Sequence, residues 1–421
     1  MTGSRKLKES PKRTSAVPPA ASGRSVHESV LRLPERFRPQ EAIGLDARWV
    51  LDIAGHGLFT VSVRDGRCSV QAGNGIPPDA TLRTDPRTWL GLESGLTDGI
   101  AAFTRGDLSV AGDLHLALRL ETLFLPGPAA QRFLRIARTD VGGFEVESVI
   151  AGRGTPVVLL HGLAASKVSF LPTLDGLADR YEVHALDLPG FGKSAKPLPT
   201  GKRYSARWMA KVVRDYLRAQ RIRHAYLIGN SMGGRIAVEV ALRYPRRTLG
   251  VVTLGSAVAF DEWQWLGLAL RTLRSEWLAV SPVPLRRRWV ESAVADLFAD
   301  PARIPPQNIA AAAEEFLRSV KDARHRLAIA ACARHLGAEK ANGRNSFWER
   351  LEGLRTPSYW VWGSEDRLSS CRYAERVRTH APTARVEVWD GIGHVPQFED
   401  IDGTNVRVGA FLDDLEASRH L

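Results

Sequence analysis

Cysteine and methionine are scarce in this chain of 421 residues, with three of each. Cys68, Cys332 and Cys371 lie far apart, so we expect neither a disulfide framework nor a cysteine-based metal site. No apolar run approaches the roughly 18 residues that a membrane-spanning helix needs. The basic N-terminus lacks the apolar segment of a signal peptide. Together these absences predict a cytoplasmic protein.

The composition is otherwise that of a globular chain, with 44% apolar and 25% charged residues, and the length suits two domains. The formal net charge is +12, and part of this excess lies in residues 1–25. That segment is rich in Ser, Pro and Ala, and we expect a disordered basic tail with a weak attraction to anionic lipid surfaces. The chain carries no helix-turn-helix, zinc-finger or RNP signature, so nucleic acid is not an expected partner.

A small α+β domain is predicted for residues 26–126. Residues 59–63 alternate as a half-buried strand, and Asp65-Gly66 turns the chain into a second strand at 68–71. A third strand follows at 80–84, and the helical patterns beyond it begin at Asp85-Pro86, an N-cap followed by proline. Strands first and apolar helices after them predict helices packed on one face of a sheet.

Three motifs in this domain resemble the sterol carrier protein 2 (SCP2) family over about residues 45–125: Val63-Arg64-Asp65-Gly66-Arg67, the strand 80–84, and Ala101-Ala102-Phe103-Thr104-Arg105-Gly106-Asp107-Leu108-Ser109-Val110-Ala111-Gly112-Asp113. The resemblance implies a five-stranded sheet whose helices enclose an apolar tunnel for fatty acyl chains or sterols. A lipid is therefore the expected ligand of this domain. A domain that keeps the fold but only packs against its neighbour is the alternative.

The second domain is predicted to span residues 140–421. Leu125-Pro126-Gly127-Pro128 marks the boundary, followed by a short linker helix over 127–139. Beyond it, strand patterns alternate with helices, which predicts a doubly wound, mostly parallel sheet. The alternation stops at about 257–350, a segment of helical texture rich in aromatic residues. We interpret this segment as a helical cap over the carboxyl edge of the sheet, where ligands bind in such folds.

The pentapeptide Gly229-Asn230-Ser231-Met232-Gly233 lies between a strand pattern and a helix pattern. Strand, Gly-x-Ser-x-Gly and helix form the context in which a serine becomes a nucleophile. Glycine belongs at both flanking positions because a side chain there would collide with neighbouring backbone. Taken alone, the pentapeptide fits an ordinary glycine-rich turn equally well.

Candidate partners for this serine follow later strands. Gly363-Ser364-Glu365-Asp366 and Gly391-Ile392-Gly393-His394 each come after a predicted strand, in the chain order serine, acid, histidine. With His161-Gly162-Leu163 and the run from Asp187 to Gly192, these motifs resemble the α/β-hydrolase superfamily over about 140–418. The resemblance implies Ser231 as nucleophile, Asp366 as acid and His394 as base. It also implies an oxyanion hole made by the Leu163 and Met232 backbone amides, with no metal or organic cofactor.

Other residues of suitable chemistry compete for these roles. Glu365 neighbours Asp366, but the Gly-x-x-Asp spacing favours Asp366. Some members of the superfamily place the acid after the preceding strand, where this chain reads Leu254-Gly255-Ser256 and has no carboxylate until Asp261. Structural roles are expected for four further residues: His161, His184, Asp187 and His224.

These observations predict a serine hydrolase that cleaves a carboxylic ester of a hydrophobic, acyl- or sterol-like substrate, of the esterase or lipase type. A C–C bond hydrolase of ring-cleavage products is the alternative, since residues 230–234 and 189–194 also resemble that group. The base in those enzymes is often followed by tryptophan, whereas His394 is followed by Val395. A lipid carrier without catalytic activity is the second alternative.

Overall fold

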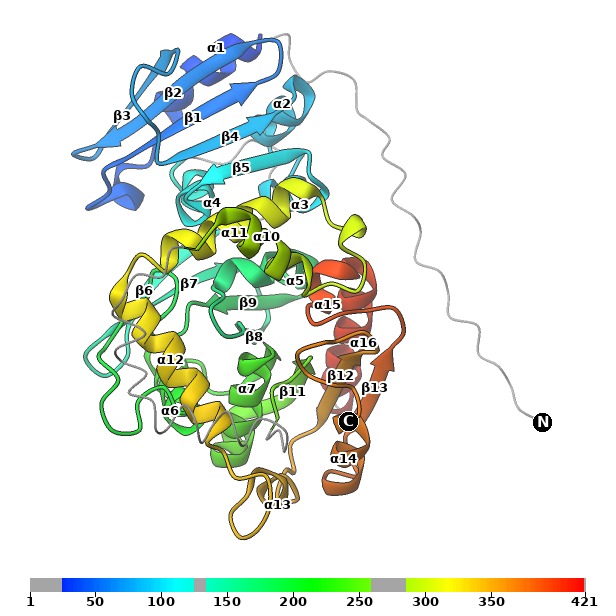
Figure 1. Ribbon diagram of the computed structural model, residues 1–421. Helices are drawn as coiled ribbons and strands as arrows, with labels where there is room; N and C mark the ends of the chain where they lie inside the picture. Colours follow the sequence, from blue (N-terminus) through cyan, green and yellow to red (C-terminus); the bar gives the residue numbers. More distant parts are fainter. Residues whose placement is uncertain (1–24, 125–133, 259–284, 420–421) are drawn as a thin grey trace.

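Residues 25–124, 134–258 and 285–419 are described here from a computed structural model (Figure 1). They form two domains, each built on its own β-sheet, one of five strands and one of eight. The predicted tail over 1–25 lies almost entirely outside the described residues. Among the described helices, none combines the length and the apolar character that crossing a bilayer requires.

The N-terminal domain has the predicted five-stranded sheet, in the order β3-β2-β1-β4-β5. Strand β1 was missing from the expected elements, although it lies at the centre of the sheet, paired with β2 and β4. The elements are α1 (Val26–Leu31), β1 (Ala47–Ile53), β2 (Gly57–Arg64), β3 (Arg67–Ala72), β4 (Ala80–Thr84), α2 (Pro86–Ser94), α3 (Gly99–Arg105), β5 (Leu108–Gly112) and α4 (Leu114–Thr122).

Aspartate caps fix where the later helices of this domain begin. The carboxylates of Asp85, Asp98 and Asp113 each accept hydrogen bonds from two backbone amides in the first turn of α2, α3 and α4. Such a cap satisfies amides that have no partner within the helix. Below the helices, Phe59, Val61 and Val63 of β2 are buried on one face of the sheet. The predicted α+β arrangement is confirmed.

The C-terminal domain contains an eight-stranded sheet in the order β13-β12-β11-β10-β8-β9-β7-β6, and the six strands from β8 to β13 run parallel. This confirms the predicted doubly wound, mostly parallel sheet. The strands are β6 (Arg135–Asp140), β7 (Glu145–Ala151), β8 (Thr155–Leu160), β9 (Tyr181–Leu186), β10 (Ala225–Asn230), β11 (Thr248–Leu254), β12 (Ser358–Gly363) and β13 (Arg385–Trp389).

The predicted linker helix over 127–139 is wrong in its described part. Arg135–Asp140 form strand β6, which pairs antiparallel with β7 from Arg135↔Ile150 to Asp140↔Glu145. The strand lies at the edge of the sheet, its sequence Arg-Ile-Ala-Arg-Thr-Asp does not alternate polar with apolar side chains, and only Thr139 is buried. A basic edge strand of this kind lacks the continuous apolar run that marks the central strands. Residues 125–133 lie outside the described part.

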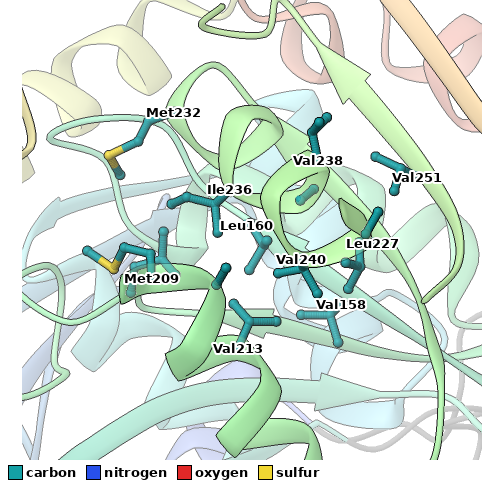
Figure 2. Packing of buried hydrophobic residues seen from close by; sticks show 14 of the residues in the cluster. Val158, Leu160, Met209, Val213, Leu227, Met232, Ile236, Val238, Val240 and Val251 are labelled. Atoms are coloured by element: carbon teal, nitrogen blue, oxygen red, sulfur yellow. The ribbon is translucent and has the colours of Figure 1, made fainter. Parts of the chain in front are cut away.

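Helices cover both faces of this sheet. Figure 2 shows Met209 and Val213 of α6 with Ile236 and Val240 of α7, packed on the strand residues Val158, Leu160 and Leu227. On the other face α5 and α16 bury apolar side chains against the same strands. The helices of the two faces are α5 (Leu171–Leu177), α6 (Ala206–Ala219), α7 (Met232–Arg243), α14 (Tyr373–His380), α15 (Pro396–Glu399) and α16 (Ile401–Arg419).

The cap is helical in its described part, residues 285–350. It contains α10 (Arg287–Ala295), α11 (Pro306–Ser319), α12 (Ala323–Gly337) and α13 (Phe347–Leu351), whereas residues 259–284 of the predicted cap lie outside the described part. Helix α11 lies between the two domains beside β5 (Figure 1). Asn308 donates to the Phe103 carbonyl at 3.2 Å, and Glu314 accepts from the Gly112 amide at 3.0 Å.

The two domains also share their apolar cores. Ala311 of α11 is buried in the core of the N-terminal domain. In the opposite sense, Ile100 and Leu118 of the N-terminal domain are buried in the core on one face of the eight-stranded sheet. Because each domain contributes side chains to the other's core, the two domains pack as one unit.

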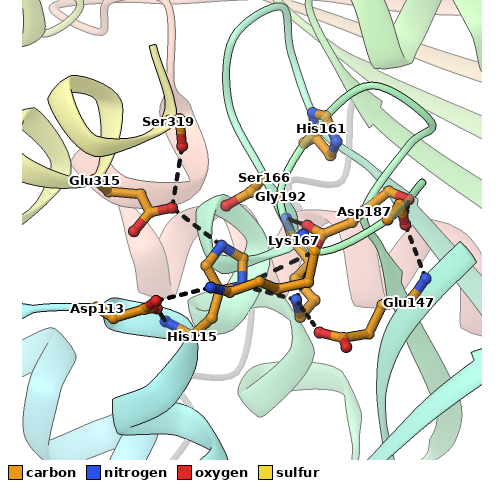
Figure 3. A network of polar contacts seen from close by, with 12 residues as sticks. Asp113, His115, Glu147, His161, Ser166, Lys167, Asp187, Gly192, Glu315 and Ser319 are labelled. Atoms are coloured by element: carbon orange, nitrogen blue, oxygen red, sulfur yellow. Dashed lines mark hydrogen bonds and ion pairs between the residues drawn. The ribbon is translucent and has the colours of Figure 1, made fainter. Parts of the chain in front are cut away.

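A buried lysine joins the two domains electrostatically (Figure 3). Nζ of Lys167, in the short 3-10 helix Lys167–Phe170, lies 2.6 Å from Asp187, 3.0 Å from Glu147 and 2.8 Å from Nδ1 of His115 in α4. Because an ammonium group only donates, Nδ1 of His115 is an acceptor, and the proton of the neutral ring is on Nε2. That nitrogen lies 3.2 Å from Glu315 of α11.

The charges in this cluster stabilise each other. Burial alone would lower the pKa of Lys167, but the carboxylates of Asp187 and Glu147 outweigh it and raise the pKa above its ordinary value. The same lysine holds the pKa of Asp187 well below its usual range, against the effect of burial. Glu147, Asp187 and His115 are close enough to hold a metal ion, but their ligand atoms already surround the ammonium group. A divalent cation there would meet a like charge.

We predict that Lys167→Met costs roughly 3–5 kcal/mol of unfolding free energy, because it leaves buried carboxylates without their cation. The measurement is urea unfolding of the full chain. Lys211→Met is the matched control, since Lys211 is exposed and lies 3.7 Å from Asp215. The control should change stability by less than about 0.5 kcal/mol. Similar small losses in both variants would contradict the assigned role of Lys167.

Candidate active site

Ser231 occupies a strained position between strand β10 and helix α7. Its φ of 52° and ψ of −118° lie in a region that residues other than glycine rarely adopt. Its amide donates to the Leu254 carbonyl of the neighbouring strand at 2.9 Å, and its hydroxyl makes no capping bond to α7. The turn therefore presents a side-chain hydroxyl at the carboxyl edge of the sheet.

Glycine is required on both sides of this serine, as the sequence predicted. A Cβ atom on Gly229 would overlap the backbone of Gly233, and one on Gly233 would overlap the carbonyl of Leu160 at the end of β8. In both cases the added Cβ atom would meet rigid backbone rather than a mobile side chain. The turn can close only without side chains at these two positions.

Asp366 and His394 meet at the same edge of the sheet. Asp366 follows β12 and His394 follows β13, and Nδ1 of His394 lies 2.8 Å from Oδ2 and 3.0 Å from Oδ1 of Asp366. The carboxylate is held by the amides of Leu368 and Ser369, at 2.9 and 2.8 Å. Both members of the pair are buried, whereas Glu365 is exposed. Of the two neighbouring carboxylates, only Asp366 contacts the histidine.

Three supports of His394 were not found from the sequence. Nδ2 of Asn230, the residue before the serine, donates to the carbonyls of Leu254 and His394, both at 2.9 Å. The His394 amide donates to the Leu297 carbonyl of the cap at 2.7 Å. Glu399 accepts from the Gly393 amide at 2.7 Å and from the Asp300 amide of the cap at 2.9 Å. The turn and the cap thus fix the position of the histidine.

Gly255 directly follows β11, the strand after which some members of the superfamily carry the acid. A Cβ atom there would come within 2.9 Å of Oδ2 of Asp366 and 3.1 Å of Nδ1 of His394. The position thus adjoins the Asp–His pair, but the chain leaves it without a side chain. The small residue makes room for an aspartate that arrives from the next strand.

The loop after β8 brings Leu163 beside the serine. A Cβ atom on Gly162 would lie 3.4 Å from Cβ of Ser231, so this loop passes directly over the turn. His161 braces the loop: Nδ1 lies 2.7 Å from the Gly162 carbonyl, and Nε2 accepts from the Leu188 amide at 3.0 Å. Burial lowers the pKa of His161 to about 4, so the ring is neutral at pH 7.

The remaining competitors also make structural contacts. Asp187 accepts from the Lys167 and Lys193 amides at 2.7 and 2.8 Å, which ties together the loops after β8 and β9. His184 lies between the Tyr216 hydroxyl and Glu182, at 2.9 and 2.7 Å. His224 contacts Arg419 far from the serine, at 3.3 Å.

Ser231, His394 and Leu163 line one cavity of about 1110 Å³. This volume exceeds the roughly 300–1,000 Å³ that is usual for a small-molecule pocket. Among the described residues, neither the Leu163 nor the Met232 amide donates to another protein group, and each adjoins the serine in space or sequence. The site thus combines a hydroxyl, an Asp–His pair and two available amides at the wall of a large cavity.

Two family models match this chain. The model described as the alpha/beta hydrolase fold matches residues 155–401, and that of the SCP-2 sterol transfer family matches residues 32–125. The chain belongs to the alpha/beta hydrolase fold family. Its hydrolase domain follows an SCP2 domain, which confirms both resemblances found in the sequence.

Curated relatives of the hydrolase domain have several activities. A dihydrolipoyllysine-residue acetyltransferase component of an acetoin cleaving system, from Pseudomonas putida, is 29% identical over 293 residues, which cover 68% of this chain and 70% of the relative. Lipase 1 of Psychrobacter immobilis is 26% identical over 269 residues, which cover 63% and 79%. These identities are similar, so they do not single out one activity.

Solved structures share the hydrolase fold. A membrane phospholipase A described as a bacterial virulence factor has 27% identity and a TM-score of 0.54, covering 67% of this chain and 87% of that one. A 2-hydroxy-6-oxo-6-phenylhexa-2,4-dienoate hydrolase of Rhodococcus sp. strain RHA1 has 19% identity and a TM-score of 0.55, covering 67% and 100%. The second similarity concerns the fold alone.

We predict that Gly233→Ala lowers the thermal unfolding temperature, because the new methyl group would overlap the Leu160 carbonyl and force the serine turn out of position. Overpacking of this kind costs roughly 1–3 kcal/mol. The control is Gly75→Ala, where an added Cβ meets nothing within 4 Å. Unchanged unfolding of Gly233→Ala would show that the turn tolerates a side chain.

The buried imidazole of His161 lowers the stability of the fold in acid. His161 stays unprotonated in the hydrolase until its pKa of about 4, whereas the unfolded chain takes up this proton near pH 6.5. The unfolded state thus binds more protons in this window, and stability falls as the pH falls through it, by about 3 kcal/mol from this residue. In urea unfolding, His161→Gln should lose less stability than wild type between pH 6.5 and 4. His56→Gln, at an exposed turn, should follow wild type; equal losses in all three proteins would contradict the assignment.

Proposed function

We propose that this protein is a serine hydrolase that cleaves a carboxylic ester of a hydrophobic, acyl- or sterol-like substrate. The observation that carries the proposal is the strained Ser231 turn in one cavity with the hydrogen-bonded pair of Asp366 and His394. A hydroxyl is a weak nucleophile until a positioned base removes its proton, and the base needs an orienting acid. The similarity to Lipase 1 and to the phospholipase A structure supports an ester as the target.

In the proposed reaction, Oγ of Ser231 attacks the ester carbonyl and its proton moves to Nε2 of His394. Asp366 holds Nδ1–H and stabilises the imidazolium that forms. The tetrahedral intermediate collapses, the C–O bond to the alcohol breaks, and His394 gives its proton to the departing alkoxide. Water, deprotonated by His394, then attacks the acyl-enzyme. The C–O bond to Ser231 breaks, His394 returns the proton to Oγ, and the carboxylic acid leaves.

The backbone amides of Leu163 and Met232 are assigned to the oxyanion. Both belong to segments that meet at the serine, and neither donates elsewhere among the described residues. Donors already in place where charge develops stabilise a transition state without reorganisation, and one such donor is worth about 10²–10³ in kcat. Apart from the ester and water, the scheme uses only the chain's own residues.

The SCP2 domain is proposed to bind lipid in the same protein. Apolar side chains of its sheet and helices line the cavity, among them Leu82, Trp89 and Val110.

We further propose a cytoplasmic protein, in keeping with three free cysteines, and a weak contact of the basic tail with anionic membranes.

The alternative, a C–C bond hydrolase, needs a basic residue for the carboxylate of its substrate. The described residues of the cavity wall include three arginines, Arg36, Arg38 and Arg105, all in the SCP2 domain. Arg38 and Arg105 are paired with Glu41 and Asp107, at 2.8 and 2.9 Å. Among the described residues of the wall, the hydrolase domain and its cap contribute neither arginine nor lysine, which favours an ester.

We predict that an alkyl fluorophosphonate labels wild type at Ser231, and that Ser231→Ala is not labelled and loses ester hydrolysis by at least about 10⁴-fold. Intact-mass spectrometry and hydrolysis of p-nitrophenyl esters give the two readouts. Ser69→Ala, on an exposed part of strand β3, is the control and should match wild type. If wild type and Ser231→Ala behave alike in both assays, the chain is a carrier rather than a serine hydrolase.

A further inference from the structure

The cavity that contains Ser231 is not confined to the hydrolase domain. The same cavity is lined by Leu108 and Val110 of β5 and by Phe103 of α3, all in the SCP2 domain. At its other end it is lined by Ser231, His394 and Leu163. The expected lipid tunnel of one domain and the candidate active site of the other are therefore two ends of one space.

Helix α11 of the cap forms a wall between these two ends. Ala311 and Ala313 are buried, but Ala312 between them lines the cavity and keeps more than a third of its surface accessible. Phe316, one turn further along the same helix, also lines the cavity. A small residue at position 312 leaves the passage between the domains open.

The interface beside the passage holds the two domains in a fixed position relative to each other. Lys167 holds His115 of the SCP2 domain against Asp187 and Glu147 of the hydrolase domain, and Val168 beside it lines the cavity and packs against the cores of both domains. Because the buried ion cluster and the shared apolar core flank the passage, its shape is fixed. It needs no separation of the domains to connect its two ends.

One acidic residue of the wall, Glu121, is compatible with an apolar ligand. Glu121 of α4 lines the cavity with an accessible side chain, and desolvation by the surrounding protein together with the charges of Asp98 and Asp175 raises its pKa to about 8. At neutral pH this side chain is therefore mainly the uncharged acid. An acyl chain passing it would not have to displace water from an ionised carboxylate.

We infer that the long acyl chain of the substrate extends from Ser231 past Ala312 into the SCP2 domain, so that one bound molecule contacts both domains during hydrolysis. This inference rests on the proposed ester hydrolysis at Ser231. The SCP2 domain is then a fixed part of the substrate site, one that selects chain length, rather than a separate carrier that releases lipid through water. A short ester uses only the hydrolase end and gains nothing from the SCP2 domain.

Blocking the passage tests this inference kinetically. In Ala312→Trp the indole should fill the space between the domains, and the ratio of kcat/KM for p-nitrophenyl palmitate to that for the butyrate should fall about tenfold or more, since even two buried methylenes carry that much binding energy. Ala410→Trp, on an exposed part of α16, is the matched control and should keep the wild-type ratio. The same ratio in all three proteins would overturn the inference.

Photo-crosslinking of the wild-type chain tests occupancy without catalysis or mutation. Two palmitate analogues, one with a diazirine at the chain end and one with a diazirine beside the carboxyl group, are bound, irradiated and mapped by peptide mass spectrometry. We expect the first to label peptides of 82–124 in the SCP2 domain and the second to label peptides around Leu163 or Val395. Labelling of one domain by both probes, or no labelling by either, would overturn the shared site.

The two experiments separate the inference from the function on which it rests. If no ester is hydrolysed and a fluorophosphonate does not react at Ser231, the proposed hydrolase activity fails. The crosslinks still decide whether one chain occupies both domains. If esters are hydrolysed but both probes label only the hydrolase domain, the activity stands and the shared site is wrong.

Discussion

The buried ammonium group of Lys167 connects the SCP2 domain to the hydrolase domain beside the candidate active site. It lies at the point where the loop after β8, the loop after β9, strand β7 and helix α4 of the SCP2 domain meet. The first of these loops carries the Leu163 amide over Ser231. A single cation, satisfied by two carboxylates and an imidazole, thus positions part of the candidate oxyanion hole and one whole domain. Either carboxylate, left without the lysine in this interior, would be an uncompensated charge.

Because Lys167 contacts both domains, the two domains form one structural unit. They belong to families that are described separately, one for sterol transfer and one for hydrolysis. In this chain they share apolar cores, a cap helix and a cavity. The cap is the decisive element: α11 packs on β5 of the SCP2 domain, while the segment after α10 provides the Leu297 carbonyl for the His394 amide. The cap therefore contacts both the candidate active site and the SCP2 domain.

The sequence was most informative where chemistry is local. Ser231, Asp366 and His394 each belong to a short motif at the end of a strand, and parallel strands place such motifs at one edge of the sheet. It was least informative where contacts come from distant segments. His115, Glu147, Lys167 and Asp187 lie in four separate segments without a recognisable spacing, so their meeting depends on the tertiary fold. Strand β6 was mistaken for a helix because an edge strand buries too little to show a strand pattern. The shared cavity follows only from the packing of the two domains.

If one substrate molecule connects Ser231 to the SCP2 domain, a long inhibitor bonded to the serine must reach both domains. The most direct measurement is a crystal structure of the full chain inactivated with hexadecyl fluorophosphonate. We expect phosphorus bonded to Oγ of Ser231, a phosphoryl oxygen facing the Leu163 and Met232 amides, and continuous density for the alkyl chain past Ala312 to Val110 and Leu82. Density that turns out to solvent, or that ends within the hydrolase domain, would contradict it.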